Sequence, residues 1–191
     1  MTDALAVVIA LKSFHSAKSR LRASLPDVEV DTLVRQLADD MVSAAAGWPT
    51  TIVSNDRDVR EWAAGRSCAV HAGGVGLNDS LQRAVAAVRA TATRIVIAHA
   101  DVWSPGAFVD SDFSAQVTIC TDRHGTGTNV LVIPAHEDFT FRFGATSARD
   151  HHAEALHRGL TWERREVHPW SLDIDDESDF HFAMARGKKP L

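Results

Sequence analysis

Continuous hydrophobic runs alternate with segments of helical periodicity in the first half of the chain. Residues 5–11 read Leu-Ala-Val-Val-Ile-Ala-Leu, which is typical of a strand buried on both faces. Three similar runs predict further strands, at residues 51–54, 69–71 and 94–99. Helical spacing of apolar residues predicts three helices between them, at residues 31–46, 57–64 and 79–90, with Asp31 as the cap of the first. This alternation predicts a parallel sheet with helices on both faces.

The second half has a different pattern, in which strands follow one another with only a loop between them. Apolar runs at residues 117–120 and 130–133 predict two strands joined by the loop of residues 122–129. The remaining expected elements are strands at residues 139–143 and 165–167 and helices at residues 147–157 and 177–185. The expected fold is therefore α/β with a mixed, mostly parallel central sheet, in which ligands bind beyond the carboxyl ends of the strands.

Length and charge narrow the class of protein. With 191 residues the chain can form one full hydrophobic core, so we expect a single domain over residues 1–191. A net charge of -5 leaves no basic surface of the kind that binds extended nucleic acids. No apolar run reaches the ~18 residues of a membrane span, and the first residues lack the positive charge of a signal peptide. We therefore expect a cytoplasmic protein with no membrane partner.

The loop of residues 122–129, Asp-Arg-His-Gly-Thr-Gly-Thr-Asn, carries more polar groups than a hairpin turn requires. Its two glycines would let backbone N–H groups approach an anion, and its threonines and Asn129 add side-chain donors. This composition favours a site for a phosphate or a carboxylate. The alternative is a long polar hairpin, because Gly, Asn and Asp also dominate ordinary turns.

Three basic residues, Lys12, Lys18 and Arg20, follow the first predicted strand. Near the carboxyl end of a strand they could neutralise a triphosphate, since Arg forks onto phosphate oxygens and Lys acts as a movable point charge. The alternative is a solvated basic loop.

Three aspartates complete the candidate chemistry. Asp101 ends an apolar strand, and Asp173 and Asp175 alternate around an isoleucine, so that both point the same way in an extended segment. Carboxylates that face a phosphate chain suit Mg²⁺, which prefers oxygen ligands. The alternative is that Asp175 or Asp176 caps the last predicted helix.

Two further segments lead into predicted helices and could offer N–H groups to an anion. Residues 73–78 read Gly-Gly-Val-Gly-Leu-Asn, a spacing that matches neither the dinucleotide fingerprint nor the P-loop. Asn78 could contact a base or cap the helix. Residues 143–147 read Phe-Gly-Ala-Thr-Ser, and Ser147 is a candidate helix cap.

Taken together, these segments resemble the guanylyltransferases of deazaflavin coenzyme F-420 biosynthesis, and the resemblance covers nearly the whole chain. The similar segments are Lys12 with residues 17–21, residues 76–78, Asp101, residues 122–129, residues 143–151 and residues 173–175. The most specific are residues 122–129 and the Asp-x-Asp pair at residues 173–175.

The resemblance implies a three-layer Rossmann-like nucleotidyltransferase fold and transfer of GMP from GTP to a phosphorylated three-carbon acid, with release of pyrophosphate. The acid is phosphoenolpyruvate, 2-phospholactate or 3-phosphoglycerate in different members of the family. By position, the implied contacts are Lys12, Lys18 and Arg20 with the GTP phosphates, Gly74, Gly76 and Asn78 with the nucleotide, Thr128, Gly144 and Ser147 with the acid, and Asp101, Asp173 and Asp175 with Mg²⁺. A homodimer is a possible assembly.

Two segments depart from the family pattern. Asp101 is followed by Val-Trp in place of Leu-Pro, and residues 143–147 replace the usual Phe-Gly-Pro-Gly-Ser. Because the second segment borders the acid, the sequence leaves the identity of the acid open. Two other hypotheses also stay open: a nucleotidyltransferase with a different acceptor, and a non-catalytic nucleotide-binding protein.

Overall fold

Strand β1 (Leu5–Ala10) lies inside the sheet and is buried along nearly its whole length, as its apolar sequence predicts. In this computed structural model, which describes residues 4–108, 112–166 and 168–187, β1 pairs in parallel with β2 (Thr50–Val53) and with β4 (Arg94–His99). β3 (Ala69–His71) extends the parallel half beyond β2. The four strands predicted in the first half are confirmed.

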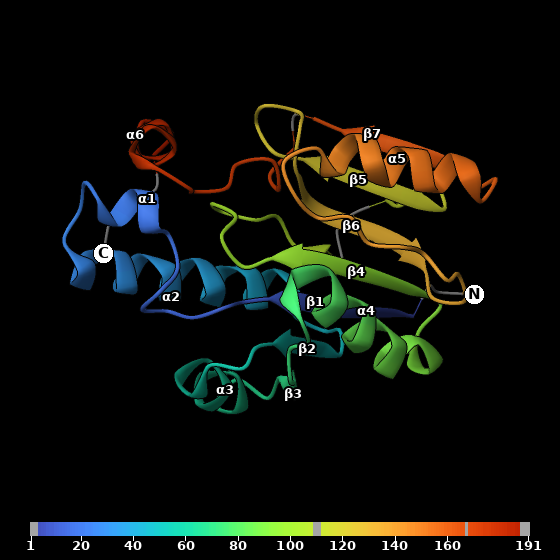
Figure 1. The fold of residues 1–191 in the computed structure, drawn as a ribbon, viewed down its shortest axis with the longest axis horizontal. Helices are drawn as coiled ribbons and strands as arrows, with labels where there is room; N and C mark the ends of the chain where they lie inside the picture. The colour runs from blue at the N-terminus through green and yellow to red at the C-terminus, as the bar shows by residue number, and fades with distance from the viewer. Residues whose placement is uncertain (1–3, 109–111, 167, 188–191) are drawn as a thin grey trace.

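The other half of the sheet is mixed. β6 (Thr128–Pro134) runs antiparallel to both β4 and β5 (Val117–Thr121), and β7 (Trp162–Arg165) runs parallel to β5. The seven strands have the order β3-β2-β1-β4-β6-β5-β7 (Figure 1). The expectation of a mixed, mostly parallel sheet is confirmed.

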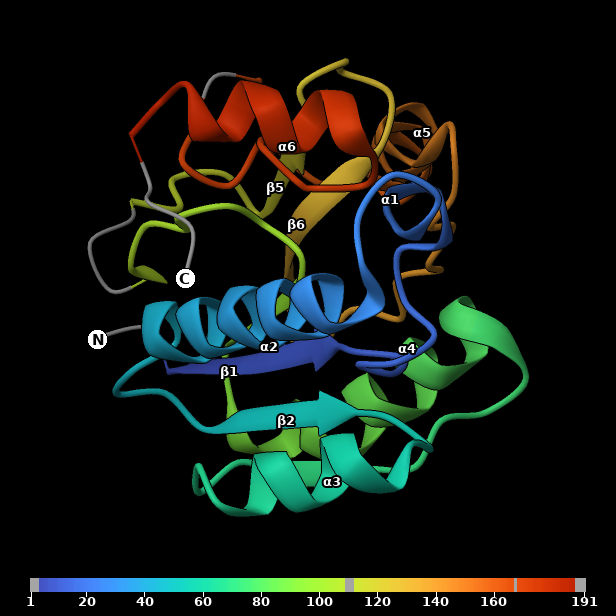
Figure 2. The same ribbon diagram turned by 90° about the vertical axis from the view of Figure 1, so that its left-hand side faces the viewer.

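Helices cover both faces of this sheet (Figures 1 and 2). One hydrophobic cluster contains residues from α2 (Asp27–Ala44), α3 (Arg57–Ala64) and α6 (Glu177–Met184). The other contains residues from α4 (Gly76–Val88) and α5 (Ser147–His157). Two short elements complete the chain, namely α1 (Ser19–Arg22) after β1 and a 3-10 turn (Arg89–Thr91) after α4.

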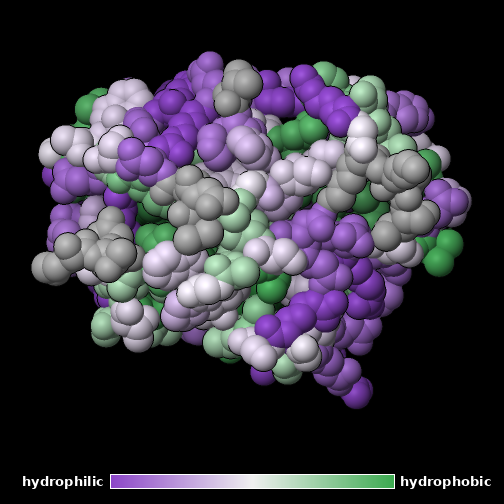
Figure 3. Space-filling view, turned by 180° about the vertical axis from the view of Figure 1, so that it is seen from behind, coloured by the Kyte–Doolittle hydropathy of each residue, from purple (hydrophilic) through white to green (hydrophobic). Residues whose placement is uncertain are grey.

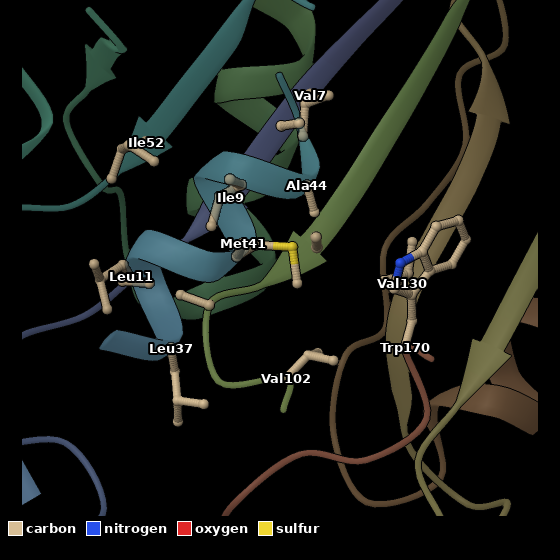
Figure 4. Packing of buried hydrophobic residues seen from close by; sticks show 14 of the residues in the cluster. Val7, Ile9, Leu11, Leu37, Met41, Ala44, Ile52, Val102, Val130 and Trp170 are labelled. Carbon is tan, nitrogen blue, oxygen red and sulfur yellow. The ribbon is translucent and has the colours of Figure 1, made fainter. Parts of the chain in front are cut away.

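The larger core lies between the sheet and α2 (Figure 4). Val7 and Ile9 of β1 join Leu37 and Met41 of α2 in it, and all four side chains are buried. Val8 points the other way and joins the second core, with residues of α4 and α5. Because both faces of β1 are covered, the strand needs an unbroken apolar sequence.

The carboxyl ends of β1, β2, β3 and β4 meet at one edge of the sheet, because these strands are parallel. In Figure 2 the arrows of β1 and β2 point to this edge. β6 runs the opposite way, so its first residues, Thr128 and Asn129, lie at the same edge. The topology therefore gathers the polar loops where the sequence predicts them.

Two helices begin earlier than the sequence pattern predicts. α2 begins at Asp27, directly after Pro26, whose fixed φ suits a helix boundary and whose nitrogen has no hydrogen to satisfy. The predicted cap at Asp31 is therefore wrong, and its carboxylate instead accepts a hydrogen bond from Arg22 at 2.6 Å. α4 begins at Gly76, three residues before its predicted start.

The segment of residues 139–143 has the predicted periodicity but not the predicted strand. Phe139, Phe141 and Phe143 are buried and alternate with exposed residues, yet this segment pairs with no strand of the described chain. Side chains from α4 and α5 replace the missing strand. The N–H groups of residues 140, 141, 142 and 143 donate in turn to Glu154, Gln82, His151 and Asn78.

The elements near the C-terminus lie close to their predicted positions. β7 begins at Trp162 and ends at Arg165, so the strand expected at residues 165–167 is shifted, and Val167 lies outside the described residues. α6 matches its predicted range to within one residue, and Asp176 caps it, as one alternative in the sequence proposed.

Hydrophilic side chains are spread widely over the face of the molecule in Figure 3, with smaller hydrophobic patches between them. Among the helices in the described ranges, none is long and apolar enough to cross a membrane.

Buried His151 on α5 gives a test of this packing. Its Nδ1 pairs with the Thr128 hydroxyl at 3.1 Å, and its Nε2 accepts the Arg142 N–H at 3.1 Å. Burial lowers the pKa of His151 to about 4. In the unfolded chain the imidazole takes up a proton below its ordinary pKa of 6.5, whereas in the folded protein it stays neutral to about pH 4. Protonation of this imidazole in the unfolded chain therefore lowers the unfolding free energy of the protein as the pH falls below 6.5.

We expect the unfolding free energy of the wild-type protein to fall by about 2.5 kcal/mol more than that of His151→Gln between about pH 7 and pH 4.5. Urea unfolding at a series of pH values measures this difference. Identical pH dependences in the two proteins would contradict the buried, neutral imidazole.

Candidate active site

A cavity of about 920 Å³ lies at the edge of the sheet where β1 to β4 end, which is large enough for a nucleotide. Its walls come from the loops that follow these strands, and the segment before α6 contributes Asp175. Seven of the residues predicted from the sequence line it: Lys12, Lys18, Arg20, Gly74, Gly76, Asp101 and Asp175. The structure thus brings together the basic loop, one glycine-rich loop and two of the three aspartates.

The ammonium of Lys18 lies between two carboxylates. It donates to Asp101 Oδ2 and, at 2.6 Å, to Asp175 Oδ1, and the Lys18 side chain is only 9% exposed. Burial acts against the charge, but these two carboxylates raise the pKa of Lys18 above its usual value. The Lys18 backbone has φ 62° and ψ 47°, a left-handed conformation that is uncommon outside glycine and recurs at functional sites.

Lys12 and Arg20 differ from Lys18 in their surroundings. Both are exposed, and neither forms an ion pair within the part of the chain that the structure describes. Their positive charges are therefore available to an anion in the cavity.

Asp173 reaches Asp101 because the chain before α6 runs antiparallel to the chain after β4. Val102 and Asp173 form an isolated β-bridge, and the Ile174 N–H donates to the Asp101 carbonyl at 3.1 Å. The alternation of residues 173–175 predicts two carboxylates on one side of a strand, but no sequence pattern predicts this bridge.

The carboxylates at this point change one another's pKa. Burial and the negative charge of Asp101 raise the pKa of Asp173 to about 7, against a hydrogen bond from Asn129. Burial also disfavours ionisation of Asp101, but the Lys18 ammonium keeps the pKa of Asp101 below its usual value. Carboxylates grouped in this way repel one another unless a cation lies among them.

The chemistry of these residues fits a hard divalent cation. Their side chains supply only oxygen donors, and Asp101 Oδ1 is buried without a hydrogen-bond partner among the described residues. As the side chains stand, no three His, Cys, Asp or Glu residues of the described chain are grouped closely enough to hold a metal ion. Because the Lys18 ammonium bonds one oxygen of Asp101 and one of Asp175, a metal would compete with it for these two oxygens.

The glycine-rich loop that lines the cavity is held by neighbouring side chains. Asn55 exchanges two hydrogen bonds with the backbone of Gly73, at 2.9 and 3.3 Å. A Cβ on Gly74 would lie 1.8 Å from Asp79 Oδ2, so a side chain at this position would collide with the first turn of α4. The loop is therefore rigidly placed at the cavity wall.

Asn78 neither lines the cavity nor caps α4. It lies in the first turn of the helix, whose N-cap is Val75. Its amide exchanges two hydrogen bonds with the backbone of Phe143, at 2.7 and 3.1 Å. The Phe143 ring packs against the rings of His99 and His151. Asn78 therefore fixes the backbone of Phe143, whose ring contacts His99 of the cavity lining.

Thr128, Gly144 and Ser147 cluster near the start of α5. Thr128 pairs with His151 of this helix, and the Gly144 carbonyl accepts the Ser147 N–H at 3.0 Å. Ser147 is the first helical residue, so the expectation that it caps the helix is wrong, and the N-cap is Thr146. The three predicted acid-binding residues do not line the cavity of the basic loop.

The loop of residues 122–129 binds an anion, but the anion is its own carboxylate. Asp122 accepts the N–H groups of His124, Thr126 and Gly127 at 3.0, 2.9 and 2.8 Å. Burial opposes ionisation of Asp122, yet these bonds hold its pKa below the usual value. The expectation that this backbone cradles a substrate anion is therefore wrong for these three N–H groups.

His99 and Asn55 line the cavity and were missed in the sequence. His99 occupies the last position of β4, and its Nε2 is buried with no hydrogen-bond partner in the described chain. The one available signal was a polar residue at the end of an apolar strand, which is too common to indicate a site.

Comparison with known proteins agrees with this geometry. A family profile described as "Guanylyl transferase CofC like" matches residues 5–190. The chain is 33% identical over 183 residues to a phosphoenolpyruvate guanylyltransferase of Sphaerobacter thermophilus, covering 90% of this chain and 88% of the relative. It is 27% identical over 190 residues to a 2-phospho-L-lactate guanylyltransferase of Methanothermobacter thermautotrophicus, covering 95% and 84%.

Solved structures share the fold at low sequence identity. A Desulfovibrio desulfuricans G20 protein described as a nucleotide-diphospho-sugar transferase superposes with a TM-score of 0.80 at 16% identity, covering 98% of this chain and 89% of that one. A 4-diphosphocytidyl-2C-methyl-D-erythritol synthase of Anaerococcus prevotii superposes with a TM-score of 0.59 at 11% identity, covering 96% and 98%. The family match over almost the whole chain shows that this protein belongs to the guanylyl transferase CofC-like family and is a nucleotidyltransferase.

Proposed function

We propose that this protein transfers GMP from GTP to a phosphorylated three-carbon acid, with release of pyrophosphate, as a step of deazaflavin coenzyme F-420 biosynthesis. The observation that carries the proposal is one cavity that combines the free cations Lys12 and Arg20 with the carboxylates Asp101 and Asp175. The names of the two relatives support an acid such as phosphoenolpyruvate or 2-phospholactate, and 3-phosphoglycerate is a third candidate.

The nucleotide binds in the cavity of the basic loop. Lys12 and Arg20 contact the GTP phosphates, because they line the cavity without a competing ion pair among the described residues. Gly74 and Gly76 form the wall against which the nucleoside lies. Asn78 acts through Phe143, whose backbone it binds, rather than on the base itself.

The acid binds beside this cavity, near the start of α5. Thr128, Gly144 and Ser147 supply its contacts, and the N-terminus of an 11-residue helix favours a negatively charged group there. Phe143 connects the two sides, because its ring contacts His99 of the cavity wall.

The reaction needs charge neutralisation more than proton transfer. A phosphate oxygen of the acid is already anionic at neutral pH, so it can attack the α-phosphorus of GTP without a strong general base. Lys12, Lys18 and Arg20 orient the phosphates and offset the charge of the departing pyrophosphate. Asp101, Asp173 and Asp175 would hold Mg²⁺, which when bound adds further stabilisation of that charge.

A pyrophosphate-release matrix tests the proposal: GTP, ATP, CTP and UTP, each with phosphoenolpyruvate, 2-phospholactate and 3-phosphoglycerate, in the presence of Mg²⁺. We expect turnover with GTP and one of the acids. GTP binding without turnover for any acid would favour a different acceptor or a non-catalytic nucleotide-binding protein.

Asp175→Asn tests the metal assignment. The substitution keeps the shape of the side chain and removes its charge, and we expect kcat to fall about 100-fold or more with an unchanged fold. Asp138→Asn is the control, because Asp138 is 83% exposed and lies outside the cavity. Near-normal pyrophosphate release by Asp175→Asn would contradict the role of this carboxylate.

Lys18→Met tests two roles of the Lys18 ammonium, its competition with the metal and its contact with GTP. Without it, Asp101 and Asp175 are free for a metal, so we expect Mn²⁺ to bind the free protein about tenfold more tightly. GTP should bind about 10- to 100-fold more weakly, because a charge-assisted contact is lost. Titration calorimetry measures both affinities. Weaker Mn²⁺ binding would show that Lys18 does not compete with the metal.

A further inference from the structure

The Asp122 carboxylate occupies the interior of the loop of residues 122–129 and accepts three of its backbone N–H groups. A Cβ on Gly127 would lie 2.7 Å from Asp122 Oδ2, so the close approach requires glycine. Two polar side chains of this loop point outward: Asn129 bonds Asp173, and Arg123 bonds Asp179 in the first turn of α6.

The first connection runs through Asp179. The Arg123 Nε donates to Asp179 Oδ1 at 2.7 Å, and the Asp179 side chain is only 9% exposed. The other oxygen, Asp179 Oδ2, accepts the N–H groups of Asp175 and Asp176 at 3.0 and 3.2 Å. One buried carboxylate therefore joins the loop to the backbone of Asp175.

The second connection is direct. Asn129 Nδ2 donates to Asp173 Oδ1 at 3.0 Å and to the Trp170 carbonyl at 3.1 Å. The loop thus holds Asp173 through its side chain and Asp175 through its backbone N–H.

Asp175 needs such support more than Asp101 does. Its side chain is 52% exposed, and Lys18 is its one side-chain hydrogen-bond partner within the described ranges. Asp101, by contrast, follows directly from the buried strand β4. Electrostatic catalysis depends on charges held within a fraction of an ångström, so freedom at Asp175 would weaken it.

We propose that residues 122–129 brace the acidic segment, and that Arg123 and Asp179 are positioning residues for nucleotidyl transfer. They fix the backbone of Asp175 so that its carboxylate stays beside Asp101, with the Lys18 ammonium between the two. This inference rests on the proposed function, because the carboxylates that it positions are the proposed metal ligands.

Arg123→Met tests the brace, with Arg57→Met as the matched control. Arg57 also pairs with one carboxylate, Glu61, but its side chain is 87% exposed and lies on α3. For Arg123→Met we expect Mn²⁺ affinity and kcat to fall about 10- to 100-fold, the range found when a group that orients a metal ligand is lost. The KM for GTP should stay within about threefold, because the basic loop is untouched, and Arg57→Met should change none of these values.

Two further variants distinguish positioning from a general loss of structure. Arg123→Lys retains a cation for Asp179 and should recover part of both the Mn²⁺ affinity and kcat. Asp179→Asn should mimic Arg123→Met, and the double variant should be no worse than either single one, because both act through one connection. Electron paramagnetic resonance of Mn²⁺ measures the affinities without any need for turnover.

The proposed bracing role is overturned if Arg123→Met lowers the melting temperature but leaves Mn²⁺ affinity and kcat unchanged. If the methionine variant does not fold, Arg123→Lys takes its place in this test. Additive effects in the double variant would overturn it as well. Failure of the proposed function has a different signature, since the wild-type protein would then release no pyrophosphate with any nucleotide and acid, whatever the Mn²⁺ affinities show.

Discussion

Mutual repulsion among carboxylates is the constraint on which the functional end of this molecule depends. Asp101, Asp173 and Asp175 come from two segments far apart in the chain and converge at one edge of the sheet. A nearby cation relieves this repulsion, and so does protonation of one carboxyl, as the raised pKa of Asp173 indicates. The Lys18 ammonium offsets the charges of Asp101 and Asp175, with which it forms ion pairs, and the Lys18 backbone is left-handed.

The fold meets this constraint with two kinds of strand pairing. Parallel pairing of β1 with β2 and β4, and of β2 with β3, places the basic loop, the glycine-rich loop and Asp101 at the same edge. An antiparallel bridge between Val102 and Asp173 then delivers the remaining carboxylates. Neither pairing would suffice alone. The parallel strands bring the basic residues and Asp101, and the antiparallel bridge brings Asp173 and Asp175.

A second wall beside the cavity is built by side chains rather than by a strand. The N–H groups of residues 140–143 are received by Glu154, Gln82, His151 and Asn78. Phe143 joins this wall to the cavity through its contact with His99. A substitution in α4 or α5 can therefore alter the position of residues 143–147, where the chain departs from the family pattern.

The sequence by itself determined most of the elements, although not the missing strand at residues 139–143, and it determined the edge of the sheet at which the polar loops gather. Unbroken apolar runs such as residues 5–11 specify buried strands, and Lys12, Lys18 and Asp101 lie in the segments after those runs, so their shared location could be predicted. The tertiary structure decided which groups each polar side chain contacts. The carboxylate of Asp122 fills the loop that composition marks as an anion site, and the Asn78 amide bonds the backbone of Phe143. Periodicity reports which face of an element is buried, but the partner of a hydrogen-bonding group is set by what folding brings within about 3 Å of it.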